Sequence, residues 1–288
     1  MRRLEKKVQE LKCNIKINLT DASSSSKSEK FLKEIERDHG CDAAMEVKKI
    51  VGSEEKTKPL AFINQKEDEN TWRNARKNLL TASTFNSVIS KRNNTLCNNT
   101  VEDILYPRDI SNLPAVQWGR DNEKSVVNMV RETTQLKIYD KLGIFQLASH
   151  PHIAATPDGL IFDSSRELGD QWGVLEIKCP YKNKERAADD SIEDYIGKKG
   201  VKETHSYYRQ ITGQMACVGV KWGLLAVWSP SMLRTHVVEF KEGLWSQWLE
   251  RLDIFYENAL APEIVDGRIP RGQSIRQWCF NDGYVFNV

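Results

Sequence analysis

The sequence feature that most restricts the fold is the segment from residue 153 to 181, IAATPDGLIFDSSRELGDQWGVLEIKCPY. Two runs of β-branched and aliphatic residues flank the polar stretch DSSRELGDQ, and this pattern predicts a β-hairpin with a long loop. The second run is apolar except for Glu176 and Lys178. Residues two apart on a strand share a face, so these charges lie side by side while Ile177 points into the core.

The charges allow two interpretations. The hairpin could be a surface element whose solvent face carries Asp158, Glu176 and Lys178. A solvent face normally alternates polar and apolar residues along its whole length, whereas GVLEIKCPY is otherwise apolar. Charges in a mostly buried strand need partners, and a metal site supplies them. The context therefore favours a metal site.

Strand pairing brings the metal ligands together. If the strand that begins near Asp158 pairs antiparallel with the second strand, its carboxylate comes close to that of Glu176. Converging carboxylates repel each other unless a cation joins them, and oxygen ligands favour Mg²⁺ or Mn²⁺. The backbone carbonyl of Ile177 would add another hard ligand. Lys178 could orient or deprotonate an attacking water, or stabilise charge on a phosphate.

Helical patterns precede the hairpin. TWRNARKNLLTASTFNSVISK predicts two helices with a break near LLTAS, where Thr81 or Ser83 would cap the second helix. WGRDNEKSVVNMVRETT predicts a helix with Glu123 about one turn before Val127. The inward residues of this helix are Val126, Val127 and Val130.

The segments after the hairpin complete a mixed fold. HSYYRQITGQMACVG predicts a helix, and WGLLAVWS and RTHVVEF predict two strands. EGLWSQWLERLDIFYENAL predicts one amphipathic helix whose apolar face carries Leu244, Trp248, Leu252 and Phe255. We therefore expect residues 67 to 288 to form an α/β or α+β domain, with a mixed central β-sheet flanked by helices.

Residues 1 to 66 differ in composition from the rest of the chain. They are dense in Lys and Glu and contain the run DASSSSKSEK. Two short helical patterns occur in them: Leu4, Val8 and Leu11, then Phe31, Leu32 and Ile35. We interpret this part as a helical or partly disordered extension, a linker or docking arm rather than a catalytic unit.

Charge and cysteine content limit the classes of function. The net charge of +2 gives no chain-wide sign of a polyanion binder, so basic residues for nucleic acid must be concentrated locally. The 6 cysteines form no CxxC pair and have no His spaced to complete a zinc site. Without a secretory signal or an apolar run of membrane-spanning length, we expect an intracellular protein that does not engage a membrane.

These motifs resemble a known family. TPDGL followed by LEIKCP is similar to the PD-(D/E)xK nuclease signature, in the form found in YqaJ-type viral recombinases and the phage lambda exonuclease family. WRNARKNLLTAS, WGRDNE and YYRQITGQM agree in type and order, so the resemblance covers roughly Trp72 to Val238. It implies a restriction-endonuclease-like core and a metal-dependent DNA nuclease. The implied reaction is 5′-to-3′ hydrolysis of linear double-stranded DNA, in recombination, repair or viral DNA processing.

The resemblance also implies roles for individual residues. The implied metal ligands are the carboxylates of Asp158 and Glu176, the carbonyl of Ile177, and Glu123, which reaches the site from a helix directly or through water. Lys178 matches the catalytic lysine, and Gln210 matches a glutamine of the last motif. A terminal 5′-phosphate and the DNA would be held by Arg76, Ser83, Thr156, Lys184 and Tyr207 or Tyr208.

The chain departs from the family pattern in three places. The segment LASHPHIAATPD lacks the further acid found upstream of the PD in lambda exonuclease, which leaves one or two metal ions open. Lys184 stands where the family has an Arg, and a lysine cannot donate two parallel hydrogen bonds to a phosphate. Phosphate binding would therefore be weaker. Some relatives hold an iron–sulfur cluster on four cysteines, but the cysteines here are dispersed, so no cluster is expected.

Partners and rival activities follow from the same comparison. Lysine-rich CPYKNKER and IGKKGVKETHSYYRQ would flank the site as a path for the DNA backbone. Lambda-type relatives form rings around DNA, so a homo-oligomer and a single-strand-annealing partner are expectations. The alternatives are a structure-specific or restriction-like endonuclease, and a non-catalytic DNA-binding module of the same fold.

Overall fold

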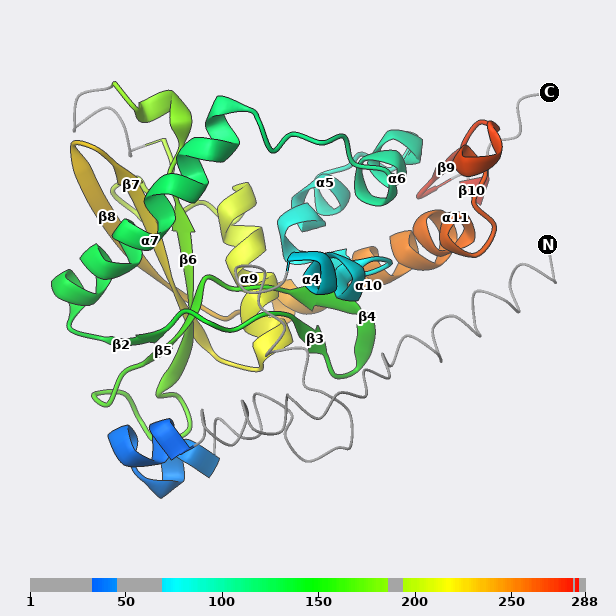
Figure 1. Cartoon of the computed structure of the whole chain (residues 1–288). Coiled ribbons are helices and arrows are strands. Elements are labelled where there is room, and N and C mark those ends of the chain that lie inside the picture. Colours follow the sequence, from blue (N-terminus) through cyan, green and yellow to red (C-terminus); the bar gives the residue numbers. More distant parts are fainter. Residues whose placement is uncertain (1–32, 46–68, 186–193, 282, 285–288) are drawn as a thin grey trace.

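The predicted hairpin lies at the centre of a five-stranded sheet (Figure 1). A computed structural model describes residues 33–45, 69–185, 194–281 and 283–284. The strand order is β2 (Lys137–Tyr139), β5 (Gly159–Phe162), β6 (Trp172–Lys178), β7 (Trp222–Ser229) and β8 (Met232–Glu239). β6 and β7 are parallel, and the other neighbours in this sheet are antiparallel. The sheet is therefore mixed, as expected.

The register confirms the pairing next to Asp158. Gly159 lies opposite Leu175, so Asp158 precedes β5 beside Glu176 on β6. The first apolar run is not one strand, however. Its first half is β4 (His150–Ala155), in a separate sheet with β1 (Leu80–Thr81) and β3 (Phe145–Leu147). Pro157 cannot donate a ladder hydrogen bond, so the chain changes sheets where it stands.

Helices cover both faces of the five-stranded sheet. On one face, α7 (Pro114–Thr134) buries its three inward valines, as predicted, in a cluster with Leu175 and Ile177. On the other face lies α9 (Ser206–Val218), the crossover that joins parallel β6 and β7. Figure 1 shows β6 between these two helices. Because side chains alternate along β6, Ile177 faces α7 while Glu176 faces α9.

The structure of the region before α7 contradicts the predicted helix cap at Thr81 or Ser83. α4 (Glu69–Arg76) and α5 (Phe85–Ile89) are the two expected helices, but Leu80–Thr81 between them is strand β1 and pairs with β4. Neither the turn Ala82–Thr84 nor α5 has a side-chain cap. The Thr81 hydroxyl instead accepts a hydrogen bond from Arg76, so the prediction that Thr81 or Ser83 caps the second helix is wrong.

The C-terminal helix is shorter than predicted. α10 (Glu242–Phe255) continues into the π-helical turn Tyr256–Leu260 and then α11 (Ala261–Val265). Trp248, Leu252 and Phe255 are buried as expected, whereas Leu244 is half-buried and Trp245 takes the core position. The other elements are α6 (Asn98–Leu105), the 3₁₀ turns η3 (Tyr181–Asn183) and Ile269–Arg271, β9 (Trp278–Cys279) and β10 (Gly283–Tyr284). In the described ranges, no helix has the length and apolar character needed to cross a membrane.

Part of the N-terminal extension packs on the domain. Residues 33–39 and 41–45 are helical, and Ile35 is fully buried in the main core cluster. His39 lies 4.0 Å from the Phe162 ring between centroids, and its Nε2 is 2.8 Å from the Tyr139 hydroxyl. The patterns at Leu4 to Leu11 and at Phe31 and Leu32 lie outside the described residues. The described part is therefore a docked helical segment rather than a solvated linker.

Close packing between α9 and α5 leads to a stability prediction. A Cβ at Gly213 would lie 2.3 Å from Cε2 of Phe85, whose fully buried ring has no free space to move into. Overpacking of this kind costs about 1–3 kcal/mol, while alanine is favoured over glycine in a helix by about 1 kcal/mol. We expect Gly213→Ala to lower the free energy of unfolding by up to about 2 kcal/mol, measured by urea denaturation.

Gly119→Ala on α7 is the matched control, because no atom lies within 4 Å of its added Cβ. In Gly119→Ala only the higher helix propensity of alanine acts, and it should raise the free energy of unfolding by about 0.5–1 kcal/mol. Equal effects of the two substitutions would contradict the packing argument.

Candidate active site

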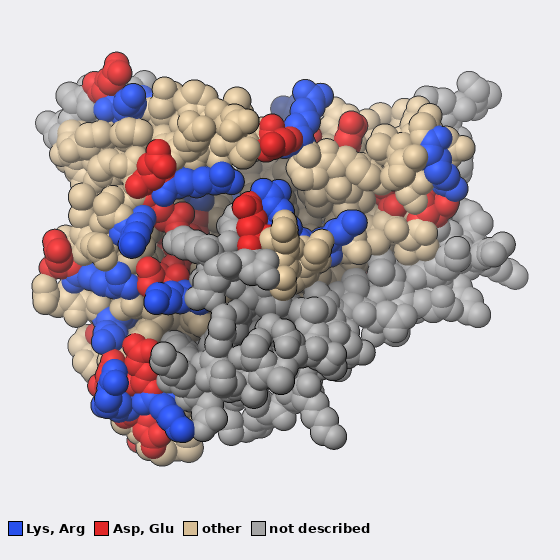
Figure 2. All heavy atoms as spheres, in the orientation of Figure 1, with Lys and Arg blue, Asp and Glu red and all other residues tan. Residues whose placement is uncertain are grey.

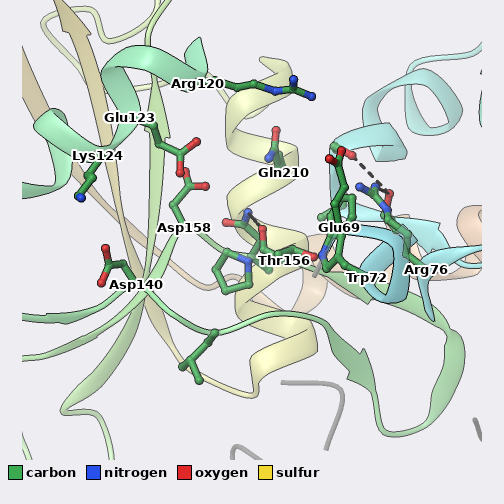
Figure 3. Close-up of a pocket in the computed structure, with 16 residues that line it drawn as sticks. Glu69, Trp72, Arg76, Arg120, Glu123, Lys124, Asp140, Thr156, Asp158 and Gln210 are labelled. Atoms are coloured by element: carbon green, nitrogen blue, oxygen red, sulfur yellow. Dashed lines mark hydrogen bonds between the residues drawn. The ribbon is translucent and has the colours of Figure 1, made fainter. Parts of the chain in front are cut away.

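A cavity of about 630 Å³ opens where β5 begins, between α7, α9 and α4 (Figure 3). Its wall collects most of the residues proposed from the sequence: Arg76, Ser83, Glu123, Thr156, Asp158 and Gln210. Figure 3 shows the carboxylates of Glu123 and Asp158 directed into the same part of the cavity. Residues far apart in the chain therefore meet at one site.

Glu176 is a buried carboxylate held by three donors. Its side chain is 2% exposed, and Lys178 Nζ lies 2.5 Å from Oε1. Gln210 Nε2 donates to the same oxygen at 2.6 Å, and Gln214 Nε2 donates to Oε2 at 2.5 Å. Gln210 and Gln214 are four residues apart on α9, so both face β6 and fix both oxygens of the carboxylate. The buried charge is fully satisfied.

Asp158 is fixed by the backbone of β6. Its N–H donates to the Leu175 carbonyl at 3.0 Å, and its Oδ2 accepts from the Ile177 N–H at 2.6 Å. Burial raises the pKa of this carboxyl well above its ordinary value, and the negative charges of Glu176 and Glu123 raise it further. Lys178 and the Ile177 N–H oppose this shift only in part.

The donor set fits a hard divalent cation, although the ligands are not gathered as they would be around one. In the part of the chain that the structure describes, no three His, Cys, Asp or Glu side chains converge in ligand geometry. Both oxygens of Glu176 are engaged by Lys178 and the two glutamines. The charges of Glu176 and Glu123 nevertheless raise the pKa of Asp158, and a cation would relieve this repulsion.

Lys178 retains its positive charge at this site. Burial favours the neutral amine, but the carboxylates of Glu176 and Asp158 outweigh burial and raise the pKa of Lys178 above its ordinary value. Its Nζ also lies 5.3 Å from the centroid of the Tyr207 ring, within cation–π range. An ammonium group that stays charged suits stabilisation of an anion better than removal of a proton.

A second group of polar side chains lies across the cavity from these carboxylates (Figure 3). Arg76 Nη2 donates to Thr81 Oγ1 at 2.9 Å, and that oxygen lies 3.3 Å from Ser83 Oγ. The Arg76 guanidinium lies over the Trp72 ring at 4.3 Å. Burial, with a smaller effect of Arg73, lowers the pKa of Arg76 from its ordinary value. Arg76 and two hydroxyls are suited to bind an anion.

Five predicted residues do not line the cavity: Glu176, Ile177 and Lys178 of β6, and Lys184 and Tyr208. Tyr208 is 5% exposed and its ring packs edge-on against Trp248, so the prediction that it contacts DNA is wrong; it is a core residue. Tyr207, the alternative, lies beside Lys178. Lys184 does not line the cavity, because it follows the turn η3 at the end of β6 and lies over the Trp118 ring.

Five charged or amide side chains of the cavity were not predicted from the sequence: Glu69, Arg120, Lys124, Asp140 and Gln214. Gln214 was detectable as the residue one helical turn after Gln210, on the same face of α9. Arg120 and Lys124 flank Glu123 on α7 and line the same wall, as their spacing on one helix face would indicate. They add positive charge to a molecule whose surface in Figure 2 otherwise mixes both signs.

Comparisons with known proteins identify relatives of this arrangement. Residues 71–221 match the family model described as the YqaJ-like viral recombinase domain. No curated protein matches the chain. These residues contain most of α4, every residue that lines the cavity except Glu69, and both strands of the hairpin.

Solved structures share the fold. The alkaline exonuclease LHK-Exo from Laribacter hongkongensis, in complex with dAMP, is 20% identical with a TM-score of 0.55, covering 70% of this chain and 97% of that chain. The shutoff and exonuclease protein of Kaposi's sarcoma-associated herpesvirus is 11% identical with a TM-score of 0.50, covering 90% of this chain and 89% of that one. The expected fold class is thus confirmed.

Proposed function

The chain belongs to the family of YqaJ-like viral recombinase domains, and from this premise we propose that it is a divalent-metal-dependent DNA exonuclease. It hydrolyses phosphodiester bonds of linear double-stranded DNA from a 5′ end. The observation that carries the proposal is the two-sided cavity, with the carboxylates of Glu123 and Asp158 on one side, called the acidic side, and Arg76 beside Glu69 on the other. A terminal phosphate bound at Arg76 would present an adjoining bond to the acidic side.

The acidic side would hold Mg²⁺ or Mn²⁺. The ligands would be Asp158, Glu176 and the Ile177 carbonyl, with Glu123 direct or through water. Oxygen donors of this kind suit hard cations. When bound, the cation lowers the pKa of a water and neutralises charge on the phosphate. Gln210 and Gln214 are positioning residues, because they fix the rotamer of Glu176 through its two oxygens.

Lys178 and Arg76 act on the substrate itself. The Lys178 ammonium neutralises negative charge that develops on the scissile phosphate. Arg76, Ser83 and Thr156 bind the terminal 5′-phosphate, which selects DNA ends over internal sites. This end selection favours an exonuclease over the endonuclease alternative.

A cleavage assay separates the proposal from its alternatives. The protein is incubated with Mg²⁺ and either linear 5′-phosphorylated duplex or covalently closed circular DNA, beside Glu176→Gln. Degradation of the linear DNA alone supports an exonuclease, and cutting of the circle favours an endonuclease. Inactivity of wild type and Glu176→Gln alike would assign the fold to a non-catalytic DNA-binding module.

Arg76→Gln is expected to abolish preference for a phosphorylated end. Hydrogen bonds to charged groups contribute about 1.5–3 kcal/mol, so wild type should degrade 5′-phosphorylated duplex about 10- to 100-fold faster than 5′-hydroxyl duplex at limiting substrate. The variant should degrade both at similar rates. Arg76→Lys should keep part of the preference, because the charge remains while the fork is lost. An unchanged ratio in Arg76→Gln would contradict the assignment.

A ring-like homo-oligomer and a single-strand-annealing partner are also part of the proposal. Both rest on family resemblance. Light scattering of the purified chain tests the first, since a ring would have several times the 33.1 kDa mass of the monomer.

A further inference from the structure

A cluster of aromatic rings and lysine lies where β6 ends, outside the cavity. Trp118 of α7 stacks on Trp228 of β7 with ring centroids 5.8 Å apart and planes at 26°. The Tyr181 ring meets Trp118 edge-on at 6.3 Å. Lys184 Nζ lies 5.7 Å from the Trp118 ring and 5.9 Å from the Tyr181 ring. We call these four residues the Tyr181 surface.

The local sequence creates this arrangement. Pro180 has no N–H to extend the strand, and the chain enters the 3₁₀ turn η3, where the Lys184 N–H donates to the Tyr181 carbonyl at 3.0 Å. Side chains three residues apart on such a turn eclipse each other, so Tyr181 and Lys184 share one face. Trp118 is half-buried, with the Tyr181 ring of this turn against its own.

The Tyr181 surface is close to the proposed active site. Tyr181 follows Lys178 by three residues, a separation of at most about 11 Å between Cα atoms. Trp118 precedes Glu123 by five residues of the same helix, about 7.5 Å along its axis. The complementary strand, unpaired within a few nucleotides of the cavity, could reach these rings.

Packing of the fold does not account for the outer part of this surface. Trp228 packs against the apolar cluster beneath α7 and holds the start of that helix on the sheet. Tyr181, by contrast, is 41% exposed, and Lys184 is exposed beside it. An exposed ring with a cation beside it offers a face for stacking and a charge for a phosphate.

We propose that the Tyr181 surface binds single-stranded DNA, namely the strand left unpaired when the opposite strand is degraded; this inference rests on the proposed exonuclease function. Stacking on Tyr181 needs a base with a free face, and bases within a duplex are already stacked on each other. Lys184 complements the phosphate charge, and Lys182 on the same turn has its Nζ 4.9 Å from the Tyr195 ring and pairs with Asp194 at 3.3 Å. Aromatic rings that alternate with lysines can stack on the bases and pair with the phosphates of a single strand.

Binding measured without catalysis tests the inference. Fluorescence anisotropy in EDTA compares a labelled oligo(dT) with a blunt duplex for wild type, Tyr181→Ala and Tyr181→Phe. Loss of one stacked base should raise the Kd of Tyr181→Ala for the oligo about 5- to 100-fold, with little change for the duplex. Tyr181→Phe should retain affinity because the ring remains. Leu168→Ala is the control, since Leu168 is 76% exposed in the loop at the opposite end of the β5–β6 hairpin.

Salt dependence gives a second readout. Removing one phosphate contact by Lys184→Gln should reduce the slope of log Kd against log salt by about 0.7 for the single strand. Unchanged oligo affinity in Tyr181→Ala, equal losses in Tyr181→Ala and Tyr181→Phe, or equal losses for oligo and duplex would overturn the inference. Cleavage by wild type with no effect of Tyr181→Ala on binding rejects this inference alone. A binding loss in a protein that never cleaves rejects the exonuclease proposal instead.

Discussion

Replacing Lys178 by methionine should lower the rate of nucleotide release from linear duplex DNA by about 10²- to 10³-fold. Methionine keeps an unbranched side chain of similar reach but removes the ammonium. The raised pKa of Lys178, produced by Glu176 and Asp158 against the effect of burial, keeps that ammonium charged at neutral and alkaline pH. We therefore expect the effect to fall on the rate at saturating substrate, with a smaller change in DNA affinity.

Single-turnover kinetics and anisotropy measure the two quantities separately. Lys221→Met is the matched control, because Lys221 is 72% exposed, pairs with Asp170 at 2.9 Å, and precedes β7 at the end of the sheet opposite Lys178. Its rate should equal that of wild type. A Lys178→Met protein that cleaves at the wild-type rate, or one that loses only affinity, would contradict the proposed role of the ammonium.

The sequence could predict the hairpin site because strand periodicity is local. Two-residue spacing alone places Glu176 and Lys178 on one face and Ile177 on the other, and the structure confirms both placements. The inward face of α7 was predictable for the same reason, since three valines at helical spacing define one stripe. Patterns of a single element suffice where one element determines the geometry.

Features that depend on pairing distant segments were not predictable. Leu80–Thr81 has no strand pattern of its own and forms β1 because β4 lies beside it. Similarly, Tyr207 and Tyr208 are adjacent on α9, a helix packed on several sides, and only the fold decides which ring faces Trp248 and which faces Lys178. Sequence motifs named several residues that the structure brings to one cavity, but the choice between neighbours required tertiary contacts.

The carboxylates of the site lower the stability of the metal-free protein. Glu176 is satisfied by Lys178 and two glutamines, so its buried charge is compensated within the protein. Asp158 is not compensated to the same degree, which is why its pKa is raised by burial and by two nearby carboxylates. Carboxylates held against their repulsion are the groups that a divalent cation stabilises most.

Asp158→Asn should therefore separate stability from activity. We expect nucleotide release to fall at least about 1,000-fold, since metal-derived stabilisation of several kcal/mol is lost and each 1.36 kcal/mol is tenfold in rate. The folded protein in EDTA should be as stable as wild type or more so. Asparagine removes the repelled charge, and its carbonyl can still accept the hydrogen bond from the Ile177 N–H.

Thermal unfolding measured across pH shows whether the Asp158 carboxyl stabilises or destabilises the folded protein. A carboxyl whose folded pKa is raised contributes stability below its ordinary value of 3.8 and loses it as pH rises through the folded pKa. Metal-free wild type should lose this contribution towards neutral pH, while Asp158→Asn should not.

Added Mg²⁺ should raise the Tm of wild type by binding the folded state, and raise that of Asp158→Asn little or not at all. Asp103→Asn, on the exposed face of α6, is the control and should behave as wild type. An equal Mg²⁺ response in Asp158→Asn and wild type would mean that the cation binds elsewhere, because the repulsion at Asp158 is what its binding is expected to relieve.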